Sequence, residues 1–239
     1  MEQEGVEKLH FELASEVRLG ILHELQSNGL KMQDVARRLG LTATEAVRQL
    51  KRLSDALMVE RQPEGTYAVT EYGKLVLQLS SSLDFVYFHR KYFLTHDVWR
   101  IPRQFIDRLS DLSQTTLKTD TMESINAAER MMGEAKQSIW GIGEGRFTEA
   151  MSRVGADQAI RGIEGKFLTP LPPSRLQSFE NRTLSDIPVL VTLTEREAGI
   201  CFRLVEGRAD YAGFFGKDPV FLGWVKDLFL YYWDKGKRS

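Results

Sequence analysis

The sequence predicts an α+β domain followed by an α/β domain, and three observations support this prediction. First, apolar residues between 31 and 57 recur at helical spacing, and a short strand-like hairpin pattern follows them. Second, helical and strand-like stretches alternate from about residue 121 onward, which is typical of an α/β sheet. Third, a chain of 239 residues has room for two ordinary domains, and the first pattern occupies only its first third.

The stretch 31–57 has the spacing of a helix-turn-helix. Gly40 lies between the two apolar runs, where the first helix must end and the chain must turn. Thr42 follows as an N-cap residue, and Glu45 comes three residues later, which together form a capping box. These signals predict that a second helix, the recognition helix of such a motif, begins directly after Thr42.

The recognition helix is expected to present a polar face to DNA. On a helical wheel, Val47 and Leu50 are expected to face the core. The opposite face carries side chains that can reach base edges and phosphates, namely Thr44, Glu45, Arg48, Gln49 and Arg52.

A hairpin follows this helix directly. Residues 58–61 and 67–70 are strand-like, and Gly65 between them tolerates a positive φ angle. A hairpin in this position is the wing of a winged helix-turn-helix domain, where Arg61 and Tyr67 can touch the DNA backbone or minor groove. The expected DNA-contacting residues are therefore Thr42, Thr44, Glu45, Arg48, Gln49, Arg52, Arg61 and Tyr67.

Charge limits how such a domain could bind double-stranded DNA. The net charge of the chain is −1, so binding must depend on local charge. Residues 31–61 contain seven basic and four acidic side chains, a modest excess that suits a module needing a second copy for tight binding. The alternative is that the charged helix face is simply solvated.

Two further helical runs flank the motif. Residues 8–27 are expected to form one helix that ends at Ser27-Asn28-Gly29. The run 74–96 carries two apolar surfaces, a stripe and a second surface, and the stripe alone would suffice to dock the helix on its own domain. The excess predicts a partner surface, either the next domain or the second subunit of a homodimer, and an intradomain core is the alternative. The stripe is Leu75, Leu79, Leu83 and Val86, and the second surface is Phe85, Phe88, Tyr92 and Phe93.

The remaining chain is expected to form a connector, 97–120, and an α/β domain, 121–239, after a first domain that spans 1–96. Asp218 and Pro219 are favoured at the start of a final helix. The expected elements before it are helices from about 121, over 147–160 and over 173–182, and strands over 138–142, 163–169, 187–193, 199–205 and 210–215.

Several kinds of chemistry are disfavoured by what the sequence lacks. All four histidines precede residue 97 and none has a metal-ligand spacing, so we expect no metal, no cofactor and no histidine-based catalysis. The glycine-rich 141–145 lacks the Lys-Ser/Thr of a phosphate loop. Paired carboxylates remain open as a catalytic alternative to solvated surface charge. Those acidic residues are Glu144, Glu149, Glu164 and Asp210.

Localisation follows from similar observations. No apolar run has the length of a membrane span, and the start of the chain lacks a secretory signal pattern. The single cysteine, Cys201, has no partner for an intramolecular disulfide. We therefore expect a cytoplasmic protein that does not contact membranes.

A small-molecule effector, if there is one, is expected to bind within the α/β domain. Open α/β sheets present ligand crevices at the carboxyl ends of their strands. Glycines there let a ligand approach the backbone, an indole offers a flat wall, and cations suit an acidic metabolite. The alternative is that Trp140 and Phe167 are core residues and the glycines only turn the chain. The candidate residues are Trp140, Gly141, Gly143, Lys166, Thr169 and Arg203.

Two segments carry a family resemblance. GLTATEAVRQLKRLSDALMVERQPEGTYAVTEYGK looks like the winged helix of archaeal transcriptional regulators. The C-terminal half resembles the methanogenesis and filamentation regulator family, in a G-x-x-D-Y hairpin from Gly207 to Tyr211 and a D-P-x-x-x-x-W-x-x-D-L-F-x-Y-Y-W run from Asp218 to Trp233. The resemblance implies a one-component regulator in which a DNA-binding winged helix is joined to an α/β sensor domain related in fold to phospholipase D-like domains.

The resemblance also bears on activity. The phospholipase-type H-x-K-x-x-x-x-D motif is absent, so no hydrolase activity is expected, and Lys166 stands where the family's central strand usually offers an arginine. The leading hypothesis is thus a non-enzymatic DNA-binding regulator. The alternatives are an enzyme whose catalytic domain is 121–239 and an interaction module whose winged helix contacts another protein.

Overall fold

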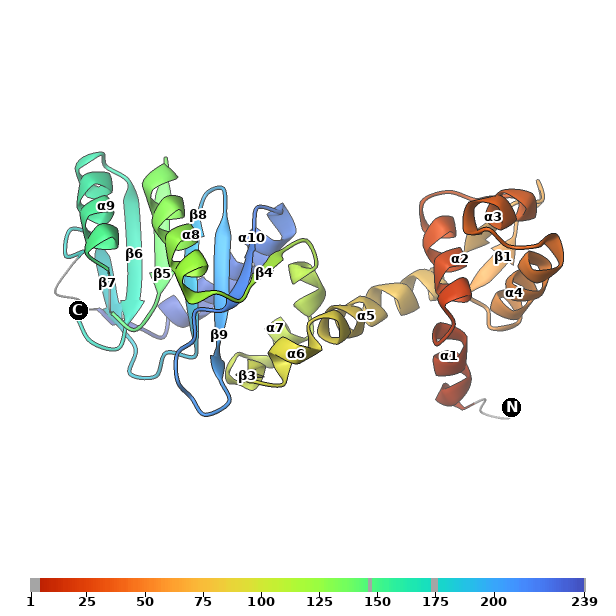
Figure 1. Cartoon of the computed structure of the whole chain (residues 1–239), viewed down its shortest axis with the longest axis horizontal. Coiled ribbons are helices and arrows are strands. Elements are labelled where there is room, and N and C mark those ends of the chain that lie inside the picture. The colour runs from red at the N-terminus through yellow and green to blue at the C-terminus, as the bar shows by residue number, and fades with distance from the viewer. Residues whose placement is uncertain (1–4, 146–147, 173–175, 239) are drawn as a thin grey trace. The chain divides into compact units, whose positions relative to one another are not determined.

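The computed structural model describes residues 5–145, 148–172 and 176–238, and its elements are labelled in Figure 1. The chain divides into two compact units, Met1–Ser81 and Ser82–Ser239. Each has a hydrophobic core of its own. The architecture is an α+β winged helix-turn-helix followed by an α/β sheet unit, as the sequence predicts.

The first unit is a winged helix. Its core gathers apolar side chains from the second, third and fourth helices and from both wing strands. The hairpin β1–β2 is antiparallel, and Tyr67 of β2 also exchanges two backbone hydrogen bonds with Leu30. Its elements are α1 (Val6–Leu13), α2 (Glu16–Ser27), α3 (Met32–Leu39), α4 (Ala43–Asp55), β1 (Val59–Arg61), β2 (Tyr67–Val69) and the start of α5 (Glu71–Phe88).

Local signals set most of the helix ends in this unit. Gly40 ends α3 in the left-handed conformation, with φ at 64°, and the Thr42 hydroxyl accepts a hydrogen bond from the Glu45 N–H at 3.2 Å. Both expectations are confirmed. The expectation of one helix over 8–27 is wrong, because Ser15 caps a new helix, α2, by accepting from the Arg18 N–H.

The second unit is built on one mixed sheet. Its strands run in the order β11-β7-β6-β5-β8-β9-β10-β4, and β3 also pairs with β9. Strands β5, β6 and β7 are parallel, and the pairs from β5 through β8, β9 and β10 to β4 are antiparallel. The strands are β3 (His96–Asp97), β4 (Thr116–Lys118), β5 (Ser138–Ile142), β6 (Glu164–Thr169), β7 (Glu180–Thr183), β8 (Val189–Thr194), β9 (Ala198–Leu204), β10 (Gly213–Gly216) and β11 (Lys237–Arg238).

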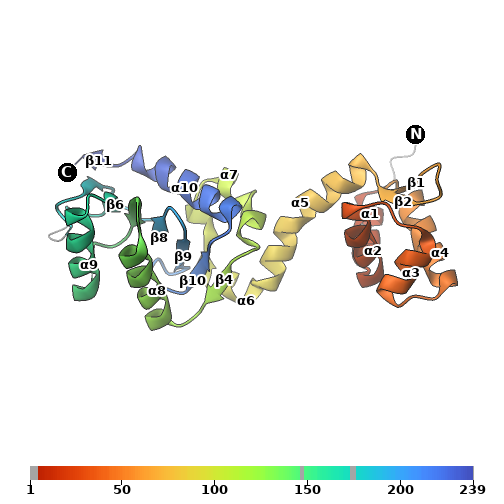
Figure 2. The same ribbon diagram turned by 90° about the horizontal axis from the view of Figure 1, so that it is seen from above.

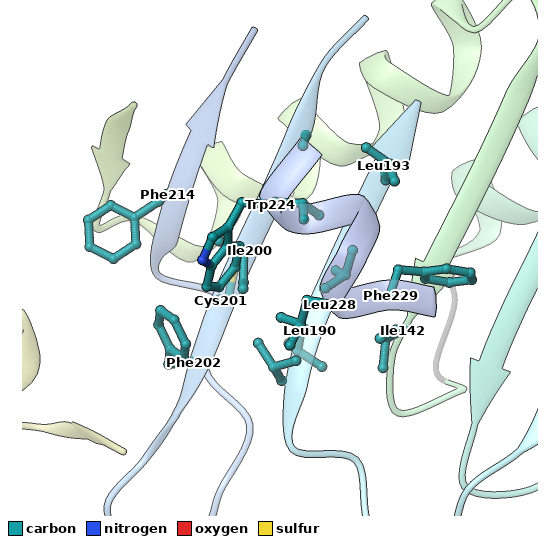
Figure 3. Close-up of a cluster of buried hydrophobic side chains, with 14 of the residues drawn as sticks. Ile142, Leu190, Leu193, Ile200, Cys201, Phe202, Phe214, Trp224, Leu228 and Phe229 are labelled. Atoms are coloured by element: carbon teal, nitrogen blue, oxygen red, sulfur yellow. The ribbon is translucent and has the colours of Figure 1, made fainter. Parts of the chain in front are cut away.

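Helices cover both faces of this sheet. Figure 2 shows α10 on one side and α8 with α9 on the other. The α10 helix starts as predicted, because the Asp218 carboxylate accepts from the N–H groups of Val220 and Phe221. Its buried aromatic and aliphatic side chains lie on the strands (Figure 3). The helices are α6 (Arg90–Phe93), α7 (Arg103–Ile106), α8 (Thr121–Glu134), α9 (Glu149–Ile160) and α10 (Pro219–Trp233), with 3-10 turns at Val98–Arg100 and Leu109–Leu112.

The division between the units differs from the expected boundaries at 96 and 120. The expected connector, 97–120, contains residues that pair with β9 and β10, and the apolar side chains around it pack into the core of the second unit. The helix expected over 74–96 ends at Phe88, and its residues Phe85 and Tyr92 are buried in that core.

The helix expected over 173–182 is wrong where the structure describes it. Residues 180–183 form β7, which pairs in parallel with β6. Part of this expectation, 173–175, lies outside the described residues, as does Phe147, the expected first residue of the preceding helix.

Glu195, in the turn between β8 and β9, holds the start of β5. Its carboxylate accepts hydrogen bonds from the N–H groups of Lys136, Gln137 and Ser138 at 2.9, 3.3 and 3.4 Å. Burial alone would raise the pKa of this carboxyl, but the backbone hydrogen bonds outweigh it and lower the pKa below its ordinary value of 4.5. The ionised form is therefore the one that stabilises the fold.

Replacing Glu195 by glutamine is expected to reduce the free energy of unfolding by about 1–2 kcal/mol at pH 7. A carboxyl with a lowered folded-state pKa stabilises the protein above its unfolded pKa, and that contribution is lost as the pH falls through the folded-state value. The difference between wild type and Glu195→Gln should therefore shrink below about pH 4.5. Urea unfolding at pH 7 and pH 3 measures it, with exposed Glu206→Gln as the control, and a difference independent of pH would contradict the assignment.

Candidate functional site

The α4 helix presents a different face to solvent from the one the sequence predicts. Ala46, Leu50 and Leu53 are fully buried against the other helices, whereas Val47 is 51% exposed. The expectation that Val47 faces the core is therefore wrong. The buried positions keep the spacing of a helix face, but that face is centred one residue earlier than expected.

Gln49 lies on the buried side of α4. It is only 7% exposed, and its Oε1 accepts a hydrogen bond from Arg18 Nη1 at 3.3 Å. Arg18 in turn donates to the backbone carbonyls of Phe11 and Glu12, at 2.6 and 2.9 Å. Gln49 thus ties α4 to the first two helices and does not lie on the surface that DNA could reach.

Arg52 also holds α1. Its Nη2 and Nε lie 2.5 and 3.3 Å from the carboxylate of Glu12, and its guanidinium is 5.0 Å from the centre of the Phe11 ring. An ion pair combined with cation–π stacking fixes this side chain along α1. The predicted DNA contact by Arg52 competes with this structural role.

Thr44, Val47, Arg48 and Lys51 are all exposed on the outward face of α4, which ends at the exposed Asp55. The sequence-based set includes Thr44 and Arg48 and misses Val47 and Lys51. Arg48 touches Glu45 only at 3.5 Å, and Lys51 has no ion pair among the described residues. Centring the helical wheel on Ala46 instead of Val47 would have identified all four.

The other expected DNA-contacting residues have mixed placements. Thr42 is exposed, but its hydroxyl is occupied as the cap of α4, and Glu45 is half-buried. Arg61 is exposed at the end of β1. Tyr67, its register neighbour on β2, is half-buried and packs against the core of the first unit, so its ring contributes to the wing's support.

The sheet places the six expected ligand-binding residues on two different faces. Gly141, Gly143 and Thr169 line a cavity of about 100 Å³ on the side of α8. The ring of Trp140 is on the opposite side, 5.1 Å from Phe229 of α10, and Lys166 lies over it at 4.7 Å. Trp140 also borders the cavity, but alternate residues of a strand point to opposite faces, so its ring and Lys166 lie on the other side of the sheet from these three residues.

Arg203 lies on the same side of the sheet as the cavity, and each nitrogen of its guanidinium makes a hydrogen bond. Its Nε donates to the Ile187 carbonyl, its Nη1 donates to the Gly207 carbonyl at 2.8 Å, and its Nη2 pairs with the Glu144 carboxylate. Glu144 itself borders the cavity. The cation expected to attract an acidic metabolite is therefore already neutralised.

Neither a metal site nor a membrane-spanning helix is found among the described residues. They contain no group of three or more His, Cys, Asp or Glu side chains arranged to hold a metal ion. No helix among them has the length and apolar character needed to cross a membrane. Cys201 is buried beside the cavity, and burial raises the pKa of its thiol well above the ordinary value.

Comparison with known proteins gives distant likenesses. No family model and no curated protein matches the chain. Among solved structures, an archaeal chromatin protein, TrmBL2, whose structure shows a novel mode of DNA binding, is similar over 98% of this chain and 97% of its own, with 16% identity and a TM-score of 0.45.

Two methyltransferases are more distant. The riboflavin-derivative dimethyltransferase RosA from Streptomyces davawensis has 13% identity and a TM-score of 0.28, over 74% of this chain and 63% of its own. CalO1, a methyltransferase of calicheamicin biosynthesis, has 14% identity and a TM-score of 0.25, over 74% and 61%. At these values none of the three structures assigns a function to this chain.

Proposed function

We propose that this protein is a cytoplasmic, non-enzymatic transcriptional regulator that binds operator DNA as a homodimer, with α4 in the major groove. The observation that supports it most is the outward face of α4, where Thr44, Val47, Arg48 and Lys51 are exposed together on a capped helix followed by a wing. On this face an apolar side chain, Val47, lies beside two cations, Arg48 and Lys51. A helix that reads DNA uses this combination.

Each of these side chains has a distinct expected contact. The major groove admits an α-helix, and an arginine can bond both acceptors of a guanine there. Val47 offers an apolar surface to a thymine methyl group, and Thr44 can bond a base edge or a phosphate. Lys51, near the C-terminal end of α4, and Arg61, on the wing, are assigned to phosphates. Arg48 and Val47 therefore specify sequence, while Lys51 and Arg61 position the domain.

Dimerisation is proposed from α5. Leu75, Leu79 and Leu83 form a stripe along this helix, and their side chains are 57%, 68% and 66% exposed. Val86, the fourth residue of the predicted stripe, packs against the core of the second unit, whereas these three leucines belong to neither core. One winged helix with few cations binds DNA weakly. A dimer would place two winged helices on half-sites about 34–36 Å apart, or a multiple of that distance.

Replacing Arg48 by alanine is expected to weaken binding to operator DNA by about 1–3 kcal/mol more than binding to random duplex, because a lost base contact removes discrimination. Replacing Lys51 or Arg61 by alanine should weaken both alike and reduce the salt slope of log K by about 1, as a phosphate contact does. The operator is first recovered from a pool of genomic fragments, and affinities are then measured by fluorescence anisotropy at several salt concentrations.

The matched control is Arg196→Ala, which removes the same charge from an exposed turn of the second unit. It should change neither affinity nor salt slope. A wild-type affinity that does not fall with salt would reject DNA binding and favour a protein partner for α4. Equal losses on both duplexes for Arg48→Ala would show that Arg48 contacts phosphate.

We also propose that the second unit senses a small molecule. The cavity between α8 and the sheet supports this, since small-molecule sites are concave and mostly apolar, with a few polar groups. Sensing requires a ligand that favours one arrangement of the paired winged helices. The test is whether a ligand of this unit changes the affinity for operator DNA.

A further inference from the structure

The cavity in the second unit has mainly apolar walls. Helix α8 contributes Ala128 and Met132, and the facing strands contribute Ile139, Phe167 and the backbone of Gly141. Gly143 and Gly145 lie beyond the end of β5, and a side chain added at Gly143 would meet no atom of the described residues within 4 Å. With a volume of about 100 Å³, the cavity is somewhat smaller than an engineered apolar cavity of about 150 Å³ that binds benzene.

A buried hydroxyl of α8 in this wall lacks a partner among the described residues. Ser124, on α8, is 2% exposed, and its Oγ makes no hydrogen bond among the residues that the structure describes. A buried hydroxyl without a partner is destabilising, and such groups in folded proteins usually meet a ligand or an ordered water. Thr192 and Tyr211 also line the cavity, so its polar groups are a minority among apolar side chains. Ser124 therefore indicates a ligand that is mostly apolar and has one polar atom.

The nearby charges indicate that this ligand is uncharged. Glu144 borders the cavity and is paired with Arg203, whose other donors are taken by two backbone carbonyls. Thr169, also in the lining, donates its hydroxyl to the Leu171 carbonyl at 2.7 Å. An ionised ligand would enter an apolar space without a counter-charge, which is costly.

We propose that this cavity binds an uncharged, largely apolar molecule about the size of a six-membered ring, with one hydroxyl or carbonyl group hydrogen-bonded to Ser124 Oγ. This replaces the acidic metabolite expected from the sequence. This inference names the class of ligand for the proposed sensor, and its regulatory meaning rests on that proposed function. Binding itself can be measured on the full chain without DNA.

The experiment measures the binding of three probes, phenol, benzene and benzoate, by ligand-observed NMR and calorimetry. Phenol should bind wild-type protein about fivefold more tightly than benzene, the effect of one net hydrogen bond, and benzoate should not bind. In Ser124→Ala the preference for phenol should disappear. The melting temperature of this variant should stay equal or rise, because an unpaired hydroxyl has been removed from the interior.

A cavity-filling variant, Ala128→Leu, should exclude both phenol and benzene. Three results would each overturn the proposal. They are a wild type that shows no saturable binding of phenol and benzene, benzoate that binds more tightly than phenol, and a preference for phenol that survives in Ser124→Ala. A melting temperature of Ser124→Ala below that of wild type would also overturn the proposal, because Ser124 would then have a structural partner. Wild type that binds phenol but not DNA would support this site while rejecting the regulator function.

Discussion

Replacing Trp224 by alanine is expected to reduce the free energy of unfolding of the second unit by about 3–5 kcal/mol. The indole is fully buried between α10 and the sheet (Figure 3), and its ring centre lies 5.7 Å from that of Phe105. Its Nε1 donates to the Phe105 carbonyl at 3.2 Å. The change would leave a large void and also a buried carbonyl without its donor, two costs that add to each other.

Urea unfolding followed by tryptophan fluorescence and circular dichroism measures the effect on the second unit. Val220→Ala, an exposed position on the same helix, is the control and should change the stability by less than about 0.5 kcal/mol. Trp224→Phe should lie between the two, because the ring is partly kept and the hydrogen bond is lost. A cost below about 1 kcal/mol for Trp224→Ala would show that α10 does not carry the core.

The winged helix could be predicted from the sequence because the residues that end and begin its helices act locally. Gly40 ends α3, Thr42 caps α4, and each signal acts within a few residues of its position. The rotation of α4 could not be fixed in the same way, because Ala46 and Val47 are both apolar and adjacent. The rotation of α4 is marked by Gln49, which is buried and hydrogen-bonded to Arg18, 31 residues earlier in the chain. Side-chain pairs at such a separation leave no periodic signal.

In the second unit, prediction from the sequence has a different limit, which is the detection of very short strands. Its long strands follow from their apolar patterns, but β3 and β4 have only two and three residues and exist because β9 and β10 offer them backbone partners. No pattern within two or three residues predicts such an edge strand. The sequence around them therefore resembles a connector, although these residues complete the sheet.

The ligand-binding residues expected from the sequence combine side chains from both faces of the sheet. Trp140 and Gly141 are adjacent, so a strand must point them to opposite sides. Strict use of this alternation would separate Trp140 and Lys166 from Gly141, Gly143 and Thr169 on the basis of sequence alone. Ser124 is different, since only the packing of α8 against the sheet shows that its hydroxyl lacks a partner among the described residues.

Replacing Leu79 by glutamate is expected to convert the proposed dimer to a monomer and to lower the affinity for operator DNA by about 100-fold or more, because the second winged helix no longer binds at high effective concentration. Leu79 is the middle and the most exposed leucine of the α5 stripe. A second copy of α5 is the partner whose apolar stripe matches it, and a carboxylate buried in that seam would have no counter-charge.

Sedimentation equilibrium at micromolar concentration, with and without operator DNA, tests this directly. Gln78→Glu introduces the same charge at the exposed neighbouring position of α5 and should leave both the dimer and the DNA affinity unchanged. Both variants keep the buried contacts of Leu77 and Phe85, so their melting temperatures should match that of wild type to within a few degrees. A wild-type monomer under both conditions would remove the dimer, and dimeric Leu79→Glu would place the interface on another surface.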